Sequence, residues 1–371
     1  MRIDVFSDFN LELEKIWCDF ETEAFLSPFQ SYAWLSLWQN TVGFPLHSIQ
    51  PQLVVVRRGK ETLALFPMGM RKAMGVSVLE WLGGQHSDYL GPLLSDKWKD
   101  LEKDFQACWQ KIIFKLIPFD VIHLQKQEEY IGALRNPFVQ SMSCSRNILS
   151  YRTNLNSTWK EHYEKKVKNK LRSDSRRQRR RLAENGELKF LVAKEQNTKK
   201  NIIDNMISQK SRRYRDTKVS DMLSIPEHKK FYEKLANIPE KTLEVHCSAL
   251  YVGKTIVATH VGLVDQSIFY YLMPAHEGGD WERYSPGRLL LEHLIEWSIK
   301  RQLKIFDFTV GIERYKKDWC DKETQLFETL EPVTFKGKMY SVAQHAKYAV
   351  KQKPWLGKHV KKLSVWLRNR K

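Results

Sequence analysis

The sequence predicts an α/β protein with mixed sheets, built from two similar halves, residues 1–150 and 187–345. Three observations lead to this prediction. The 371 residues are enough for two domains with their own cores. A strand hairpin recurs: "LVVVRRGKETLALFPMGMR" turns at Gly59-Lys60 much as "SALYVGKTIVATHVGLV" turns at Gly253-Lys254. A strand–helix–strand unit near the end predicts a parallel pair. We interpret the recurrence as a diverged duplication; the alternative is a chance similarity of two hairpins.

The basic segment between the halves, residues 151–186, is expected to be helical. Its pattern predicts one long helix from Thr158 to Asn185. Thr158 and Glu161 form a capping-box pattern, and Gly186 stands where a C-terminal glycine is expected. The apolar residues of this helix fall on one narrow stripe: Trp159, Tyr163, Val167, Leu171 and Leu182.

The elements of the second half follow from switches in hydrophobic periodicity. Helical patterns cover residues 199–214 and 227–236. Strand patterns then follow in "LEVHCSALYV", "TIVATHVGLV" and "SIFYYLM". After a loop at residues 274–284, a helix begins at Ser285 and a strand, "LKIFDFTVG", closes the unit. The helix should start near the strand ends, where α/β folds place their ligands.

The net charge of +18 is concentrated in two segments. Residues 160–181 carry a net charge of +8 and residues 347–371 carry +9, so the remainder is nearly neutral. The end of the chain, residues 346–371, is predicted to be a basic amphipathic tail. Its apolar residues, which share one helical side, are Leu356, Val360, Leu363 and Leu367. Such a tail suits an anionic membrane surface, and a terminal helix docked on the domain is the alternative.

Composition limits the remaining classes. Hydrophobic residues make up 42% of the chain, with 12 Trp, 14 Tyr and 18 Phe, which is typical of a folded globular protein. The five cysteines are odd in number, widely spaced and never in a C-x-x-C pair, so we expect neither a disulfide framework nor a metal site. The first residues, "MRIDVFSDFN", lack the apolar core of a signal peptide. We therefore expect a cytoplasmic protein.

The stretch "YSPGRLLLEHL", residues 284–294, is a candidate phosphate site. Ser285 can cap the helix and Pro286 suits its first position. Gly287 in the first turn lets a ligand approach the backbone, and Arg283 and Arg288 flank it. On these residues alone, an ordinary helix start is the favoured interpretation.

Three longer stretches carry a resemblance to a known family: "FDFTVGIERYKKDW", "FQSYAWLSLWQN" and "GGQHSDYLGPLL". Together they resemble the GNAT-type acyltransferases related to the Fem peptidyltransferases, including members assigned to cellulose and exopolysaccharide synthesis. The likeness covers about residues 20 to 345, and Asp307, Gly311, Tyr315 and Lys316 stand where that family has D, G, Y and K. The resemblance implies two tandem GNAT-like domains. It also implies transfer of an acyl group from coenzyme A, or of an aminoacyl group from tRNA in the Fem branch, to an amine.

The resemblance also implies a donor site at the candidate phosphate site. In GNAT folds the corresponding helix receives the donor's pyrophosphate on its first-turn amides, which makes Arg283, Ser285, Gly287 and Arg288 donor-binding candidates. The chain has a single glycine here, unlike the fuller signature of single-domain GNAT enzymes, so the identity of the donor stays open.

Four residues are catalytic candidates. Asp307 lies in an apolar strand, where a carboxylate would either pair structurally or orient and deprotonate the acceptor amine. Lys316 would hold an anion, and Tyr315 would donate a proton to the leaving thiolate or only pack. His260 is a possible base, although a lone histidine on an apolar face is more often a core residue.

The acceptor candidates are Asp88 and Tyr89, which follow the paired glycines Gly83-Gly84. They would face the acceptor across the cleft between the halves, or simply form a turn at the end of a strand.

These observations support three functional hypotheses. The first is an N-acyltransferase that uses acyl-CoA, above all acetyl-CoA, with a small-molecule or glycan amine such as an amino sugar of envelope or exopolysaccharide synthesis as acceptor. It would work in the cytoplasm, at the inner face of the membrane if the tail binds there. The second is a Fem-type peptidyltransferase that takes an aminoacyl group from tRNA held by the basic helix. The third is a non-enzymatic protein that binds an anionic surface, either membrane or nucleic acid.

Overall fold

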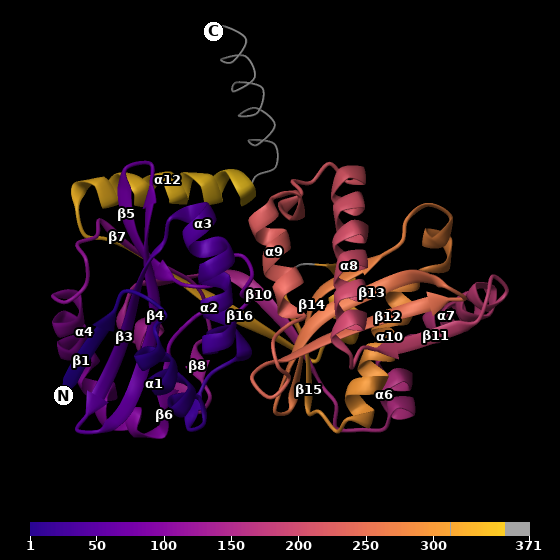
Figure 1. The fold of residues 1–371 in the computed structure, drawn as a ribbon, viewed down its shortest axis with the longest axis horizontal. Coiled ribbons are helices and arrows are strands. Elements are labelled where there is room, and N and C mark those ends of the chain that lie inside the picture. Colours follow the sequence, from indigo (N-terminus) through magenta and orange to yellow (C-terminus); the bar gives the residue numbers. More distant parts are fainter. Residues whose placement is uncertain (312, 353–371) are drawn as a thin grey trace, which may run out of the picture.

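A single mixed sheet runs through both halves of the chain in the computed structural model, which describes residues 1–311 and 313–352 (Figure 1). The strands follow the order β1-β3-β4-β5-β7-β16-β10-β15-β14-β13-β12-β11, with β6 and β2 branching from β4. The predicted α/β fold with mixed sheets and two tandem halves is confirmed.

The N-terminal half alternates strands with short helices. In chain order its elements are β1 (Arg2–Phe6), α1 (Leu11–Glu21), β2 (Ala24–Phe25), η1 (Pro28–Gln30), α2 (Tyr32–Trp38), η2 (Gln39–Gly43), α3 (Phe44–His47), β3 (Gln50–Arg58), β4 (Glu61–Ala73), β5 (Val76–Trp81), β6 (Leu93–Ser95), η3 (Asp96–Asp104), α4 (Phe105–Ile113), β7 (Val121–Gln127), β8 (Tyr130–Ile131), β9 (Leu134–Arg135), α5 (Pro137–Ser141) and β10 (Cys144–Asn154).

The remaining elements build the C-terminal half and then return to the first. They are α6 (Trp159–Lys166), α7 (Asn169–Ala183), β11 (Leu188–Val192), α8 (Gln196–Asp216), η4 (Met222–Ser224), α9 (Pro226–Leu235), β12 (Glu244–Val252), β13 (Thr255–Asp265), β14 (Ile268–His276), η5 (Gly279–Tyr284), α10 (Pro286–Lys300), β15 (Ile305–Val310), α11 (Arg314–Trp319), β16 (Lys322–Pro332) and α12 (Phe335–Gln352). The expected helices and strands of residues 199–310 are thereby confirmed.

One order of elements occurs in both halves. The antiparallel hairpin β3–β4 is followed by β5, α4 and β7, and β7 pairs parallel to β5. The hairpin β12–β13 is followed by β14, α10 and β15, and β15 pairs parallel to β14. The predicted parallel pair is therefore present, and the duplicated order has the form that the sequence suggested.

The halves exchange strands at their junction. β10 follows β7 in the chain but pairs with β15, whereas β16 follows β15 but pairs with β7. β10 and β16 also pair with each other, so the two halves share one hydrogen-bonded sheet. α12 then packs on β5, β7 and β16 of the first half. Strand β10 crosses residue 150 and helix α12 crosses residue 345. The domain boundaries at 150, 186 and 345 remain predictions.

The predicted long basic helix is wrong, because the chain breaks it into α6 and α7. Val167 is extended, with φ −103° and ψ 119°, and its side chain is buried. The break lets both helices reach the buried carboxylate of Glu292 on α10: Tyr163 donates to it from α6 and Ser175 from α7. The capping box of Thr158 and Glu161 is confirmed.

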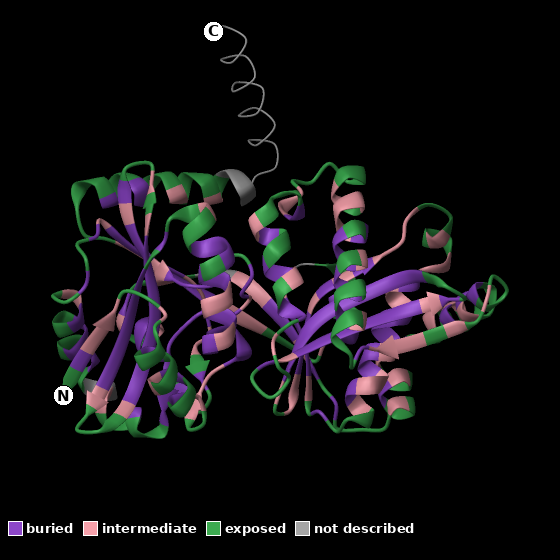
Figure 2. Ribbon diagram, viewed as in Figure 1, coloured by how far each residue is buried: buried purple, intermediate pink, exposed green. Residues whose placement is uncertain are grey.

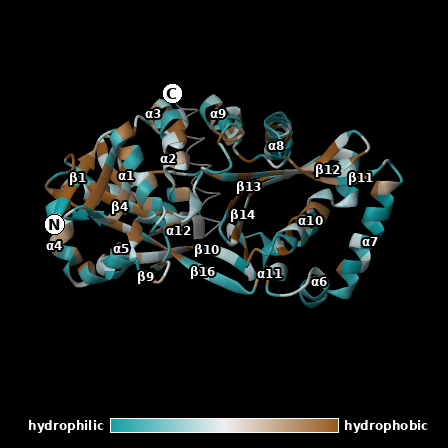
Figure 3. Ribbon diagram, turned by 60° about the horizontal axis from the view of Figure 1, so that its bottom comes forward, coloured by the Kyte–Doolittle hydropathy of each residue, from teal (hydrophilic) through white to brown (hydrophobic). Residues whose placement is uncertain are grey.

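Buried residues line the sheet in both halves (Figure 2), and α8 and α10 cover it in the second half. Hydrophobic residues follow the strands and the inner sides of these helices (Figure 3). None of the helices in the described part of the chain has the length and hydrophobicity needed to span a bilayer. Of the predicted tail, residues 353–371 lie outside the described residues, and its first residues form the end of α12.

Candidate active site

The parallel strands β14 and β15 separate after three paired residues. Pairing joins Ile268–Tyr270 to Ile305–Asp307 and stops there, although β14 continues to His276. Thr309 turns β15 away with a positive φ of 58°. Among the described residues, the edge of β14 beyond Tyr270 has no neighbouring strand on this side. The Tyr271 carbonyl accepts from the Thr309 hydroxyl and the His276 carbonyl from Arg212, and the backbone between these two residues can meet a ligand.

A cavity of about 230 Å³ lies where the strands part. The main floor comes from β14 and β15 through Leu272, Met273 and Thr309. The N-terminal half contributes Trp34 and Asp88 to the wall. The cavity thus lies between the two halves, and closing it requires both. Further lining residues are Gln85, His86, Lys210, Tyr214, Met222, Tyr232, Tyr271, Pro274, Val310, Glu313, Tyr315 and Lys316.

Lys210 brings a titratable amine to this cavity from α8. Burial lowers its pKa to about 8, and the positive charge of Arg213 adds to the effect. A lysine with such a pKa is partly neutral near physiological pH and can accept a proton. Sequence analysis missed Lys210, because a basic residue in an amphipathic helix is ordinarily solvated; its three-residue spacing from Arg213 was the available signal.

Lys316 lines the cavity but is held by the protein. Its Nζ donates to the carbonyl of Val310 at 2.9 Å and pairs with Glu313 at 3.1 Å. Gly311, with φ 145°, makes this approach possible: a Cβ there would lie 2.5 Å from Nζ of Lys316. The glycine and the lysine of the "VGIERYKK" stretch therefore act together to shape one wall.

Tyr315 and Asp88, both predicted from sequence, also line the cavity. Burial and the nearby carboxylate of Glu313 raise the pKa of Tyr315, so its hydroxyl stays protonated and can donate. Asp88 lies 3.9 Å from Nζ of Lys126 and is partly exposed. The structure thus brings Asp88, Tyr315, Lys316 and Lys210 to one cavity.

Asp307 does not line this cavity, because its side chain has no exposed surface. Its carboxylate accepts from the hydroxyl of Tyr89 at 2.8 Å, from Nε of Arg152 at 2.7 Å and from the Thr309 amide at 2.7 Å. Burial raises the pKa of Asp307, and the guanidinium of Arg152 opposes that shift. Tyr89 and Asp307 therefore join the two halves behind the cavity, and this geometry favours a positioning role for both.

His260 lies in the core, stacked on Tyr271 with ring centroids 4.8 Å apart. Neither ring nitrogen has a hydrogen-bond partner within the part of the chain that the structure describes, and burial lowers the pKa of His260 well below its usual value, so the ring is neutral. A ring with no exposed surface is out of reach of an acceptor. The placement favours the alternative of a core histidine.

The start of α10 lies at the far end of the free β14 edge. Gly287 is packed so closely on His276 that an added Cβ would lie 3.1 Å from its Cδ2. Ser285 adopts a left-handed conformation, φ 52° and ψ 50°, and its side chain makes no capping hydrogen bond, so the predicted side-chain cap is wrong. Its carbonyl instead accepts from the amides of Arg288 and Leu289. Among the described residues, the Gly287 amide has no hydrogen-bond partner.

Three arginines surround this helix start. Arg288 pairs with Asp174 of α7 at 2.6 Å, and Arg283 lies over the ring of Tyr284. Arg213 of α8, which the sequence analysis missed, contacts Nε2 of His276 at 3.0 Å without a carboxylate partner among the described residues. Positive charge and the free Gly287 amide at the start of α10 therefore lie together at one end of the β14 edge.

The region that carries this geometry is similar to a known family. Residues 169–317, which contain α10, β14, β15 and Lys316, match the family described as Acetyltransferase (GNAT) domain. The match covers less than half of the chain, and this region is similar to a GNAT acetyltransferase domain. This match supports an N-acyltransferase enzyme. No curated protein sequence matches the chain.

Solved structures show the same two-half fold. FemX superposes with a TM-score of 0.60 at 9% identity, covering 88% of this chain and 97% of that one. A conserved protein of unknown function from Bacteroides thetaiotaomicron gives 0.55 at 11% identity, covering 89% and 100%. L-PGS from Bacillus licheniformis gives 0.53 at 10% identity, covering 92% and 98%. At such identities the likeness is one of fold, and it agrees with the Fem-like resemblance of the sequence.

Proposed function

We propose that the protein transfers an acyl group, in the first place acetyl, from acyl-CoA to a primary amine. The observation that supports this proposal is the free edge of β14, which leads from the cavity at Met273 and Pro274 to His276 and the Gly287 amide. A donor with a thioester at one end and a diphosphate at the other matches both ends of that edge.

The helix start would hold the diphosphate. The N-terminus of α10 supplies the positive end of the helix dipole and the free amide of Gly287. Arg213 and Arg283 add positive charge that no carboxylate among the described residues neutralises. The pantetheine arm would then lie along the unpaired edge of β14 and hydrogen-bond its backbone.

The transfer itself uses groups that line the cavity. The carboxylate of Asp88 would bind the acceptor as an ammonium ion, which gives one proton to bulk water and becomes the neutral amine. The neutral amine then forms a bond from nitrogen to the thioester carbonyl carbon, and the carbon–sulfur bond breaks. The proton lost from nitrogen goes to Lys210, and Tyr315 gives its proton to the departing thiolate. Lys316 and Asp307 position the loop and the strand that carry these groups.

Isothermal titration calorimetry with coenzyme A and acetyl-CoA tests the donor site. Gly287→Glu should abolish binding, because its carboxylate would occupy the anion position beside the α10 amide. Gln196→Glu is the matched control: it adds the same charge at the exposed first residue of α8 and should leave the affinity unchanged. Equal affinity of the Gly287→Glu variant and the wild type would remove the donor site from this proposal, provided both melt at the same temperature.

An amino sugar of envelope or exopolysaccharide synthesis is the acceptor we propose. The cavity combines the aromatic rings of Trp34, Tyr214 and Tyr232 with the carboxylate of Asp88. Aromatic rings suit the apolar faces of a sugar, and the carboxylate suits an ammonium group. Nucleotide-linked amino sugars should raise the melting temperature, and the corresponding hydroxyl sugars should not. An equal response to both would refute this choice of acceptor. A cytoplasmic enzyme has access to both substrates, and we propose that location.

The second candidate keeps the fold and takes the aminoacyl group from tRNA. The observation that favours it is the exposed set Arg176, Arg180 and Arg181 on α7, whereas Arg177 and Arg179 are already paired with carboxylates. Neutralising the exposed three with glutamine should abolish any salt-dependent tRNA binding. tRNA binding that is absent at low salt rules this candidate out.

A further inference from the structure

Helix α12 packs its polar face on the protein and turns its apolar face outward. The helix lies along the N-terminal half over β5, β7 and β16 (Figure 1). Amphipathic helices of globular proteins ordinarily show the reverse arrangement. We therefore expect another molecule or a lipid surface to cover the outward apolar face.

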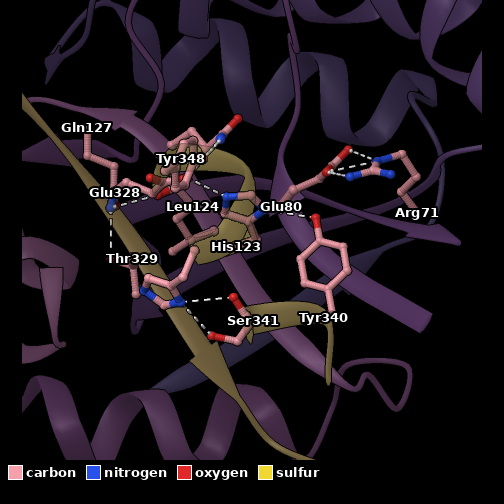
Figure 4. Close-up of polar contacts among 12 residues, drawn as sticks. Arg71, Glu80, His123, Leu124, Gln127, Glu328, Thr329, Tyr340, Ser341 and Tyr348 are labelled. Atoms are coloured by element: carbon pink, nitrogen blue, oxygen red, sulfur yellow. Dashed lines mark hydrogen bonds and ion pairs between the residues drawn. The ribbon is translucent and has the colours of Figure 1, made fainter. Parts of the chain in front are cut away.

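Buried polar groups hold the inner face of α12 (Figure 4). Tyr340 contacts Nδ1 of His123 at 3.1 Å, and Tyr348 donates to Glu328 at 2.5 Å. His123 in turn contacts Glu328 at 2.5 Å, and Gln125 donates to the same carboxylate at 2.8 Å. These directed contacts fix the rotation of the helix about its axis, so the outward position of the apolar face is built into the fold.

The apolar face is a continuous stripe. Phe335, Met339 and Val342 are 78%, 62% and 68% exposed. With the exposed Ala346 and Ala349 they follow spacings of four, three, four and three residues. At 3.6 residues per turn, these spacings place all five side chains along one side of the helix. We call this set the outer stripe of α12.

Lysines flank the outer stripe on both sides. At 100° per residue, Lys336 and Lys347 lie on one flank and Lys338 on the other, and all three are exposed. Helix α12 contains no acidic residue, and the sequence after it, residues 353–371, carries seven Lys and Arg residues and no Asp or Glu. An apolar stripe between rows of lysines is the pattern of helices that lie in a membrane interface.

Another exposed apolar side chain, outside α12, belongs to a hairpin that contacts the same helix. Met74, at the tip of the β4–β5 hairpin, is 84% exposed. The residues that flank this turn, Ala73 and Val76, pack in one hydrophobic cluster with Tyr340 of α12. The apolar surface is therefore not confined to one helix.

We propose that the outer stripe of α12, with its flanking lysines, docks on a bilayer surface that contains anionic lipids. The stripe would enter the boundary between headgroups and acyl chains, and the lysines would reach the phosphates. A second copy of the chain fits less well, because two such faces would bring their lysines together. This surface belongs to the N-terminal half and does not depend on the acyl-transfer proposal.

Flotation of the full-length protein with vesicles tests the docking. Vesicles of phosphatidylcholine with phosphatidylglycerol should bind the protein, and phosphatidylcholine alone should bind it weakly. A triple variant in which serine replaces Phe335, Met339 and Val342 should have a partition coefficient that is about tenfold lower, or lower still. The matched control replaces two exposed apolar residues elsewhere, Leu11→Ser with Phe114→Ser, and should bind like the wild type.

Two further measurements distinguish docking through the outer stripe from binding through the tail and from dimer formation. Deleting residues 353–371 should weaken binding but leave it sensitive to the serine substitutions. Binding that the deletion abolishes and the substitutions do not affect would assign the contact to the tail and overturn the proposal. Sedimentation velocity without lipid would overturn it as well if the substitutions convert a dimer into a monomer. The melting temperature should be equal in all variants, which confirms that the fold is intact.

Discussion

Replacing Arg152 by methionine should destabilise the junction between the halves. The guanidinium pairs with two carboxylates, at 2.7 Å to Asp307 and 2.6 Å to Glu128, and lies 5.0 Å above the ring of Tyr89. Methionine keeps most of the side-chain volume but removes the charge. Two carboxylates that face the junction are then left without their cation.

The expected loss is about 3 kcal/mol of unfolding free energy. Removing one partner of a buried pair costs about 3–5 kcal/mol. Asp307 has no exposed surface, whereas Arg152 and Glu128 are 22% and 20% exposed, so water reduces the Glu128 contribution and the lower end applies. Adding Asp307→Asn should recover about 1–2 kcal/mol, because the neutral amide no longer requires a cation.

The pH dependence of this variant has a definite sign. Burial already raises the pKa of Asp307, and losing Arg152 raises it further. A raised folded-state pKa favours the protonated folded state, so that contribution is present at low pH and is lost as pH rises through the folded pKa. The deficit of Arg152→Met should therefore be smaller at pH 5 than at pH 8.

Urea unfolding of wild type, both single variants and the double variant measures these terms. Arg71→Met is the matched control, since Arg71 and Glu80 form a similar pair at 2.9 Å on the N-terminal half. The side chains of Arg71 and Glu80 are 26% and 19% exposed. We expect Arg71→Met to lower the unfolding free energy by about 1 kcal/mol or less. If Arg152→Met costs no more than Arg71→Met, or if its effect simply adds to that of Asp307→Asn, the interpretation of this junction is wrong.

Four further predictions concern single residues. Between pH 7 and 9, kcat/KM should rise about tenfold, because the neutral fraction of Lys210 increases around its pKa of about 8. The Lys210→Met variant should be about 10²-fold slower, and its kcat/KM should no longer rise over this pH range. In Gly337→Ala the new Cβ would lie 1.9 Å from the carbonyl oxygen of Asp120, so limited proteolysis should cut α12 faster than in the wild type. Glu328 has a pKa lowered to about 2, so it stabilises the fold above its unfolded pKa of about 4.3 and this stabilisation is lost as pH falls toward 2; acid titration of Glu328→Gln should show a smaller loss there. His260→Leu should keep its rate within about twofold, since the ring has no polar partner to lose, and a large rate loss in a folded variant would restore His260 as a base.

Predictions from the sequence succeeded where the signal is local. Hairpin turns at Gly59 and Gly253, the capping box of Thr158 and the strand–helix–strand unit each depend on residues a few positions apart. The same approach failed at the break after α6, because the break is set by contacts to Glu292, more than a hundred residues further along the chain. The predicted cap at Ser285 also failed, because its left-handed backbone places the carbonyl, rather than the side chain, at the helix amides.

By itself the sequence determined the class of fold and the tandem halves, and it pointed to two separate stretches for the donor candidates and the acceptor candidates. Periodicity and turn chemistry specify which elements form and which of their faces are apolar. Only the tertiary structure decided which polar groups meet: Tyr89 reaches Asp307 across 218 positions, Lys210 enters the cavity from another element, and α12 turns its apolar side outward. The physical reason is that such contacts depend on strand order and helix rotation, which long-range packing sets and no local pattern encodes.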